Sequence, residues 1–182
     1  MEYWIVYNQA SGEVLWRGSG SLGTGAFQQL PEGAALVVVP QAVIARQELD
    51  LAALRAALAL RVDAEAERAR QRFLTPGSGQ AMTYQRKEAE ARAFLADEAA
   101  PVPFLDVEAP ARGMTVAELA AEVIALADAW TAIGSVIEGV RMGAKARIAA
   151  ADTLGGIVAA AALDWTVLVE TEVALAANAP SN

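Results

Sequence analysis

Large apolar residues recur along residues 115–147 with alternating spacings of three and four positions. They form one stripe: Val116, Leu119, Val123, Leu126, Trp130, Ile133, Ile137 and Val140. This spacing is the a/d repeat of helices that pack against other helices, so the segment predicts a long amphipathic helix. We take the stripe as the candidate protein interface and call it the a/d seam.

The start of this helix is predicted by the tetrapeptide Thr115-Val-Ala-Glu118, which has the form of a capping box. The helix is expected to continue to Ala150 unless it breaks near Gly139 or Gly143, because glycine weakens a helix interior. At its full length it would favour an elongated chain.

The positions that flank the a/d seam carry mostly small residues, such as Ala120, Ala127, Ala129 and Gly134. The Glu/Lys pairs that specify a two-stranded zipper are nearly absent, so the pattern favours a helical bundle or a trimer. Two alternatives stay open. Other helices of the same chain cover the seam, or the chain forms a homo-oligomer in which three copies are preferred over two.

Further helices are predicted over residues 50–74, 81–98 and from Asp152 or Thr153 to Ala162. The first has one apolar face, formed by Leu51, Leu54, Leu58, Val62, Ala66, Ala69 and Phe73. Residues 99–113 contain three prolines and are expected to form an ordered connector and not a helix. The tail at 165–173 fits helix or strand, with helix favoured.

The N-terminal region is different, because β-branched and aromatic residues dominate 3–7, 14–17 and 35–39. Turn-forming residues at 8–12 join the first two as a hairpin, and the third run adds a strand. The expected fold is therefore mainly α, an elongated helical bundle with coiled-coil-like helices and a small N-terminal antiparallel β module. We divide it into a β module (1–47) and a helical oligomerisation or docking domain (48–182).

Composition narrows the function. The chain has no His and no Cys, which removes the usual zinc sites, disulfides and the Ser-His-Asp arrangement. Its net charge of -8 and the lack of a Lys/Arg run argue against nucleic acid and an anionic membrane as partners. Charges such as Asp128 and Glu138 are expected to interrupt any membrane span, and the acidic N-terminus is unlike a signal peptide.

Two patterns were weighed as candidate chemistry. Gly18-Ser-Gly-Ser-Leu-Gly23 has the GxGxxG spacing of a dinucleotide fingerprint, but no apolar helix follows, which favours a flexible loop. Carboxylates such as Glu88/Glu90 and Asp97-Glu98 are expected on solvated helix faces. No catalytic, cofactor-binding or metal-binding residue is predicted, no cofactor is expected, and the chain is not expected to be an enzyme.

One segment resembles a known family. Thr75-Pro-Gly-Ser-Gly-Gln80 followed by Tyr84-Gln-Arg-Lys87-Glu-Ala-Glu90-Ala91, with Trp130 and the later Arg147-Ile-Ala-Ala150, resembles the helical domain of tailed-bacteriophage tail fibre assembly proteins and of fibre-associated or tail-tip proteins. The likeness covers roughly residues 70–165. The resemblance implies a role in attachment or assembly and supplies no catalytic residues.

The expected function is thus that of a non-enzymatic tail component, fibre or tail-tip, that assembles with other tail proteins and with copies of itself, in the virion or in the host cytoplasm during assembly. The alternative is a tail fibre assembly chaperone that binds the fibre transiently. A glycan hydrolase and a helical adaptor unrelated to phages are the remaining alternatives.

Overall fold

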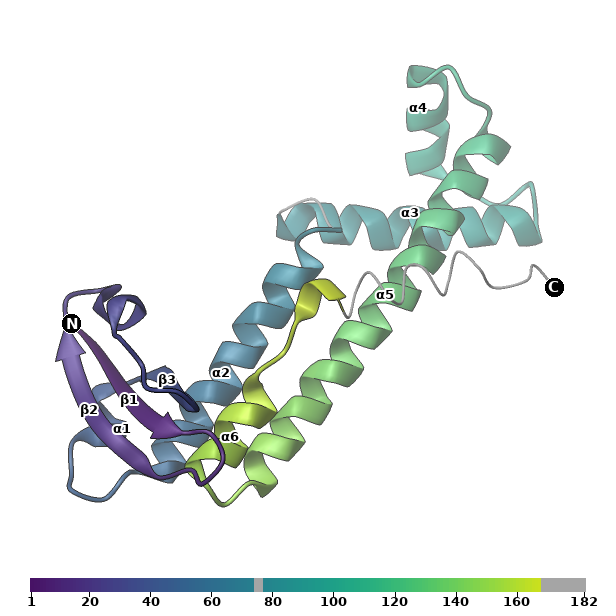
Figure 1. The fold of residues 1–182 in the computed structure, drawn as a ribbon. Coiled ribbons are helices and arrows are strands. Elements are labelled where there is room, and N and C mark those ends of the chain that lie inside the picture. Colours follow the sequence, from purple (N-terminus) through teal and green to yellow (C-terminus); the bar gives the residue numbers. More distant parts are fainter. Residues whose placement is uncertain (74–76, 168–182) are drawn as a thin grey trace. The chain divides into compact units, whose positions relative to one another are not determined.

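The computed structural model describes residues 1–73 and 77–167. It has the expected fold class, a mainly α chain with a small N-terminal antiparallel sheet (Figure 1). The chain divides into two compact units. Among the described residues, unit 1 joins 1–67 to 138–165, and unit 2 joins 68–73 and 77–137 to 166–167. These units cut across the division at 47/48 that the sequence suggested.

The sheet of unit 1 has the strand order β2-β1-β3, with β1 (Glu2–Asn8) between β2 (Val14–Gly20) and β3 (Ala34–Val39). Both pairings are antiparallel. The run from Trp4 to Tyr7 is buried, since the central strand has a neighbour on each side. The predicted hairpin and third strand are therefore confirmed. A 3₁₀ turn, η1 (Thr24–Phe27), and a short helix, α1 (Gln41–Ile44), flank β3 in sequence.

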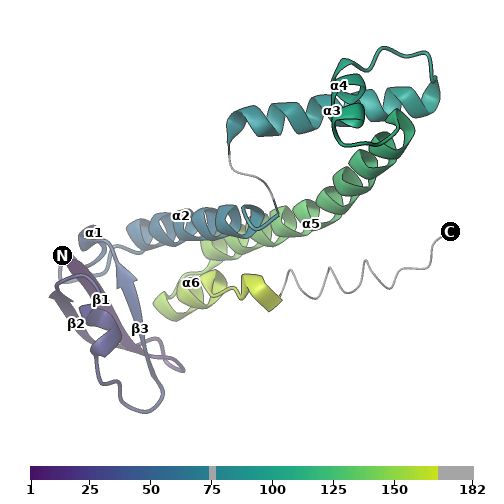
Figure 2. The ribbon, with the colours of Figure 1, turned by 90° about the horizontal axis from the view of Figure 1, so that it is seen from above.

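Three helical segments complete unit 1: α2 (Leu51–Arg70), α6 (Leu154–Ala161) and the second half of α5 (Val116–Ala150). They lie side by side in two perpendicular views (Figures 1 and 2). The predicted apolar face of α2 is confirmed, because its central residues are almost fully buried: Leu54, Leu58, Val62, Ala66 and Ala69. Phe73 was wrongly placed on that face, since it lies beyond the helix end and is 41% exposed.

Helices α5 and α6 start at capping residues that the sequence predicted. The Thr115 backbone N–H donates to Glu118 Oε2 over 2.8 Å, and the Glu118 N–H donates to Thr115 Oγ1 over 3.2 Å. Thr153 caps α6 by accepting the N–H of Gly156. Helix α5 runs unbroken through Gly139 and Gly143, so the break that these glycines suggested does not occur.

Unit 2 is built from α3 (Ser78–Ala96), α4 (Pro103–Ala111) and the first part of α5. Its core draws on all three helices and the loop before α4: Ala91, Val102, Leu105, Ala109, Leu119 and Ala120. Phe94, Val116, Val123 and Ile124 pack against it while remaining partly exposed.

Helix α4 corrects the prediction that residues 99–113 form a non-helical connector. Pro103 occupies the first helical position, where the missing N–H would have no intrahelical partner. Pro110 lies in the last turn, so it interrupts little of the ladder, and Gly113 then leaves the helix with a φ of 70°. The proline count alone overstated helix breaking because it ignored where each proline falls.

Helix boundaries elsewhere differ from the predicted 50–74 and 81–98 by a few residues at each end. Residues 74–76, and the part of the tail prediction that covers 168–173, lie outside the described residues. The described start of the tail, residues 165–167, is helical, as the sequence favoured.

Candidate assembly interface

The residues of the a/d seam have different surroundings along α5. Leu119 and Ile137 are buried, with 0% and 1% exposed surface. Val116 and Val123 pack on the core of unit 2, whereas Trp130, Ile133 and Val140 are half-buried. Leu126, midway along the seam, is 64% exposed. The chain itself therefore buries the seam near Leu119 and Ile137 and leaves Leu126 between them open to a partner.

Glu90 is a buried carboxylate at the centre of unit 2. It is 4% exposed, and its Oε2 accepts the backbone N–H of Phe104 over 2.8 Å and of Leu105 over 3.3 Å. These are N–H groups of the first turn of α4, which has no capping side chain of its own. The expectation that Glu90 lies on a solvated face is therefore wrong, because the α4 turn covers it and uses it as an acceptor.

The second oxygen of Glu90, Oε1, has no hydrogen-bond partner among the described residues and lies 3.4 Å from Nε of Arg86. Arg86 is largely exposed, at 64% of its side chain. A buried carboxylate is stabilised here by the positive end of the α4 dipole and by its two N–H donors. Glu90 thus joins α3 to α4.

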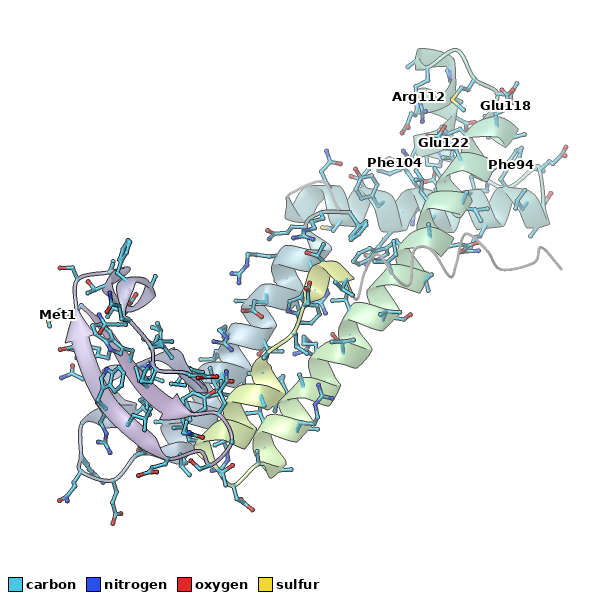
Figure 3. The ribbon with its side chains drawn as sticks, viewed as in Figure 1. Met1, Phe94, Phe104, Arg112, Glu118 and Glu122 are labelled. Atoms are coloured by element: carbon cyan, nitrogen blue, oxygen red, sulfur yellow. The ribbon has the colours of Figure 1, made fainter. Side chains whose placement is uncertain are left out.

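A chain of ion pairs extends from Glu90's helix across unit 2. Lys87 lies one turn before Glu90 and pairs with Glu108 of α4, with 2.6 Å between Nζ and Oε2. Arg112 then links Glu108 to Glu122 of α5, with Nη2 2.9 Å from both Glu122 oxygens. Figure 3 shows Arg112 and Glu122 where α4 leads into α5. The hydrogen bond from Lys87, more than that from Arg112, lowers the pKa of Glu108.

A second charged cluster fixes α2 against α5 within unit 1. Asp63 of α2 accepts hydrogen bonds from Lys145, with Nζ 2.7 Å from Oδ2, and from Arg141. Arg141 also pairs with Glu138 of its own helix. The bond from Lys145, followed by that from Arg141, lowers the pKa of Asp63. Hydrogen bonds to Glu138 and then to Asp63 raise the pKa of Arg141.

Two other polar residues of α2, Arg55 and Glu65, contact the residues around α6. Arg55 donates to the carbonyl oxygen of Ala151 from both Nε and Nη2, at 3.1 and 2.8 Å. Trp165 donates its indole N–H to Glu65 over 3.1 Å. The polar residues of α2 therefore hold helix ends in place, which is a structural role.

The backbone N–H groups of the glycine-rich segment at residues 18–25 bind a carboxylate of the same chain, that of Glu2. Glu2 accepts the backbone N–H of Gly23 over 3.0 Å and of Gly25 over 2.7 Å. Such N–H groups would cradle the phosphates in a nucleotide site, but here a carboxylate occupies them. The segment also differs from the expected flexible loop, because β2 continues to Gly20 and η1 follows without a βαβ unit.

Two shallow hollows are lined by described residues. One, of about 370 Å³, lies between β2 and α1 and is bordered by Tyr3, Arg17 and Gln41 among others. Arg17 is committed there to the carbonyl oxygens of Arg46 and Gln47. The other, of about 390 Å³, is an apolar hollow over α4 beside Phe104 and Val107. Neither brings two unpaired carboxylates together in the manner of a glycosidase.

Chemistry that a metal or an acid-base pair would need is not found in the described residues. No group of three or more Asp, Glu, His or Cys side chains is placed there to hold a metal ion. Three carboxyl groups of the described residues have a lowered pKa. Ion pairs lower the pKa of Asp63 and of Glu108, and the capping hydrogen bonds from Thr115 lower the pKa of Glu118. The candidate carboxylates Glu88 and Asp97 make local contacts, to Arg92 and to the Ala99 N–H.

Helix α5 is long and apolar enough to cross a membrane by length and composition, and 11% of its most apolar window is buried. The charged residues that we expected to interrupt a membrane span, such as Asp128 and Glu138, are too widely spaced to do so by length and composition. Asp128, Thr131 and Ser135 nevertheless give this part of the helix an exposed polar side. The Asp128 carboxylate accepts from Arg92 of α3 over 2.6 Å.

Comparisons with protein-family models, with curated proteins and with solved structures gave no match.

Proposed function

We propose that the chain is a non-enzymatic structural component of a bacteriophage tail, at the fibre or tail-tip, that assembles with other tail proteins through its helical bundle. The observation that carries this proposal is the structural role of the residues on which the family resemblance rests. Lys87, Glu90 and Ala91 all lie at the α3–α4 contact, as an ion pair, a buried cap and a core residue. A motif whose residues build a fold and no reaction centre suits an assembly module.

The exposed apolar residues support an assembly role on both units. Leu22 and Phe27 are 84% and 83% exposed in the segment that Glu2 ties down, and Phe104 and Val107 are 44% and 74% exposed on α4. Ordered apolar side chains at the surface are typical of contact sites between proteins. In this proposal the β module and unit 2 each present a contact to neighbouring tail proteins.

The proposal is tested on purified phage particles by quantitative mass spectrometry, with the chain expressed at its natural level. The chain should be present at a fixed stoichiometry to a tail protein. A Glu90→Ala variant, which removes the α4 cap, should be depleted from particles, whereas the matched variant Glu88→Ala, at a half-buried position that caps no helix, should be retained. Absence of the wild-type chain from intact particles would contradict a permanent tail role.

The second candidate, a tail fibre assembly chaperone, is favoured by the open part of α5 around Leu126. An exposed apolar helix face can shield apolar surface on a nascent fibre until the fibre assembles. Co-expression separates the two functions. A chaperone should raise the yield of soluble fibre and then dissociate, so that it is found in the host cytoplasm but not in the particle.

A further inference from the structure

Part of α5 carries a row of apolar positions that the described residues of its own unit leave exposed or half-buried, which we call the open stripe: Leu126, Ala129, Ile133 and Val136. Leu126 and Ala129 are exposed, and Ile133 and Val136 are half-buried. The spacings are three, four and three residues, so the open stripe follows the same 3.5-residue period as a coiled-coil seam. All four residues belong to unit 2.

The open stripe is rotated from the a/d seam that the sequence suggested. Leu119 and Ile137 of that seam are turned into the chain's own packing and are fully buried. Ala129 and Val136 occupy g positions, which the sequence assigned to the flank of the seam. The packing of the described residues thus covers one side of α5 and leaves the d/g side of its middle section only partly covered.

The side of α5 opposite the open stripe is polar. This helps to decide whether a membrane or a protein covers the open stripe. Asp128, Thr131 and Ser135 are exposed, and Asp128 is paired with Arg92. A helix that crosses a bilayer alone must be apolar around its whole circumference. A helix with one apolar row and one polar row is suited to a protein partner.

The distribution of charge along α5 is compatible with a second copy of the chain as that partner. Each copy carries a net charge of -8, so self-association requires a face without charged groups. Between Glu122 and Glu138 the only ionisable residue is Asp128, which lies away from the open stripe, and Glu122 is neutralised by Arg112. Two copies can therefore meet along the open stripe without placing like charges in contact.

The residues beside the open stripe point to the same partner. Ala125 and Ala132 are small and exposed, so two helices can approach closely there. The row also lacks the flanking charges by which helices select a different partner. We propose that α5 of one copy packs along the open stripe against α5 of a second copy, in a closed dimer or trimer.

This inference names the partner of the assembly surface and so rests on the proposed function for its biological role. Its test uses the purified full-length chain alone. Light scattering coupled to size exclusion, followed over a dilution series, should give two or three times the mass of 19.0 kDa and a return to monomer on dilution.

Ala129→Glu places a charge in the open stripe at an exposed position, so the monomer should keep its helical circular dichroism. Its dissociation constant should rise at least tenfold, since two carboxylates would be brought together at the contact. Ser135→Glu adds the same charge on the polar side of α5 and should leave the dissociation constant unchanged.

A wild-type chain that is monomeric at every concentration tested would overturn the inference, as would an oligomer that Ala129→Glu leaves intact or that Ser135→Glu disrupts equally. Flotation of the purified wild-type chain with lipid vesicles that Ala129→Glu abolishes would identify a lipid surface as the occupant and would also overturn it. A monomeric chain found in phage particles would refute self-association alone. An oligomer absent from particles would refute the tail role alone.

Discussion

Glu90 of α3 accepts the backbone N–H of Phe104 in the first turn of α4, with 2.8 Å between its Oε2 and the Phe104 nitrogen. The bond joins two helices across a loop that contains Pro101, with Pro103 as the first residue of the second helix. It supplies the helix cap that no residue next to α4 provides. The fold of unit 2 therefore depends on a carboxylate fourteen positions before the amide that it binds.

Replacing Glu90 by Ala should destabilise unit 2 by about 2–4 kcal/mol, because two N–H groups at the start of α4 lose their acceptor and a buried space is left. Glu90→Gln keeps one acceptor oxygen and should cost about 1 kcal/mol. The measurement is amide hydrogen exchange of the α4 segment. The half-buried control Glu88→Ala loses only its pair with Arg92 and should change stability by about 0.5 kcal/mol. Equal exchange in Glu90→Ala and Glu88→Ala would show that the buried cap contributes nothing special.

The Lys87–Glu108 pair should show measurable coupling, because Lys87 is only 11% exposed and Glu108 is 30% exposed. In a double-mutant cycle of Lys87→Ala and Glu108→Ala, we expect a coupling energy of about 1 kcal/mol, somewhat above that of an exposed pair. Chemical unfolding of the four proteins gives the value. The Arg92–Glu88 pair is a matched control with a more exposed cation, and it should couple less strongly. A coupling energy that is the same for both pairs would contradict the importance of burial here.

The Asp63 cluster predicts a pH dependence. Since Lys145 and Arg141 lower the folded-state pKa of Asp63, its contribution to stability is complete above its unfolded pKa of about 3.9 and is lost as pH falls through the folded value. Asp63→Asn should therefore be less stable than the wild type near neutral pH, and the difference should shrink on acidification. Urea midpoints from about pH 6 to about pH 2.5 measure it. A difference that stays constant across that range would show that Asp63 has an ordinary pKa in the folded chain.

Local patterns in the sequence predicted the helices and strands of this fold better than they predicted which elements contact one another. The capping residues Thr115 and Thr153 fixed two helix starts, because a cap depends only on residues three positions away. The buried face of α2 was predicted for the same reason, since its period lies within one helix. Helix α4 was missed because its prolines were taken as helix breakers. Its cap, Glu90, comes from a different helix and leaves no local signal to correct that error.

The interface was harder to predict than the helix that carries it. The a/d repeat locates apolar residues on α5, but it does not say which of them the same chain covers. Leu119 is buried in a core that it shares with residues of α3 and α4, whereas Leu126 is exposed. Glu90 and Asp63 gave no sign of burial or pairing, because a carboxylate on a charged helix face has the same sequence pattern whether or not another helix covers it.

Two glycines should respond in opposite directions to the same substitution. Gly18 of β2 lies opposite Trp4 in the sheet, and a Cβ at Gly18 would overlap the indole ring, which is only 4% exposed and cannot easily move. Gly18→Ala should therefore destabilise the chain by about 1–3 kcal/mol through overpacking. Gly139 lies in the interior of α5 with open space around the position of a Cβ, so Gly139→Ala should stabilise it by about 1 kcal/mol.

Urea unfolding followed by tryptophan fluorescence and by far-ultraviolet circular dichroism measures both variants. Gly18→Ala should shift the fluorescence midpoint to lower urea because Trp4 lies beside the substitution, and Gly139→Ala should shift the circular dichroism midpoint to higher urea. If Gly18→Ala were neutral, β2 would have to lie farther from Trp4 than the sheet register requires. If Gly139→Ala were destabilising, another helix would have to approach α5 closely at that position, outside the open stripe, which the open space around Gly139 does not predict.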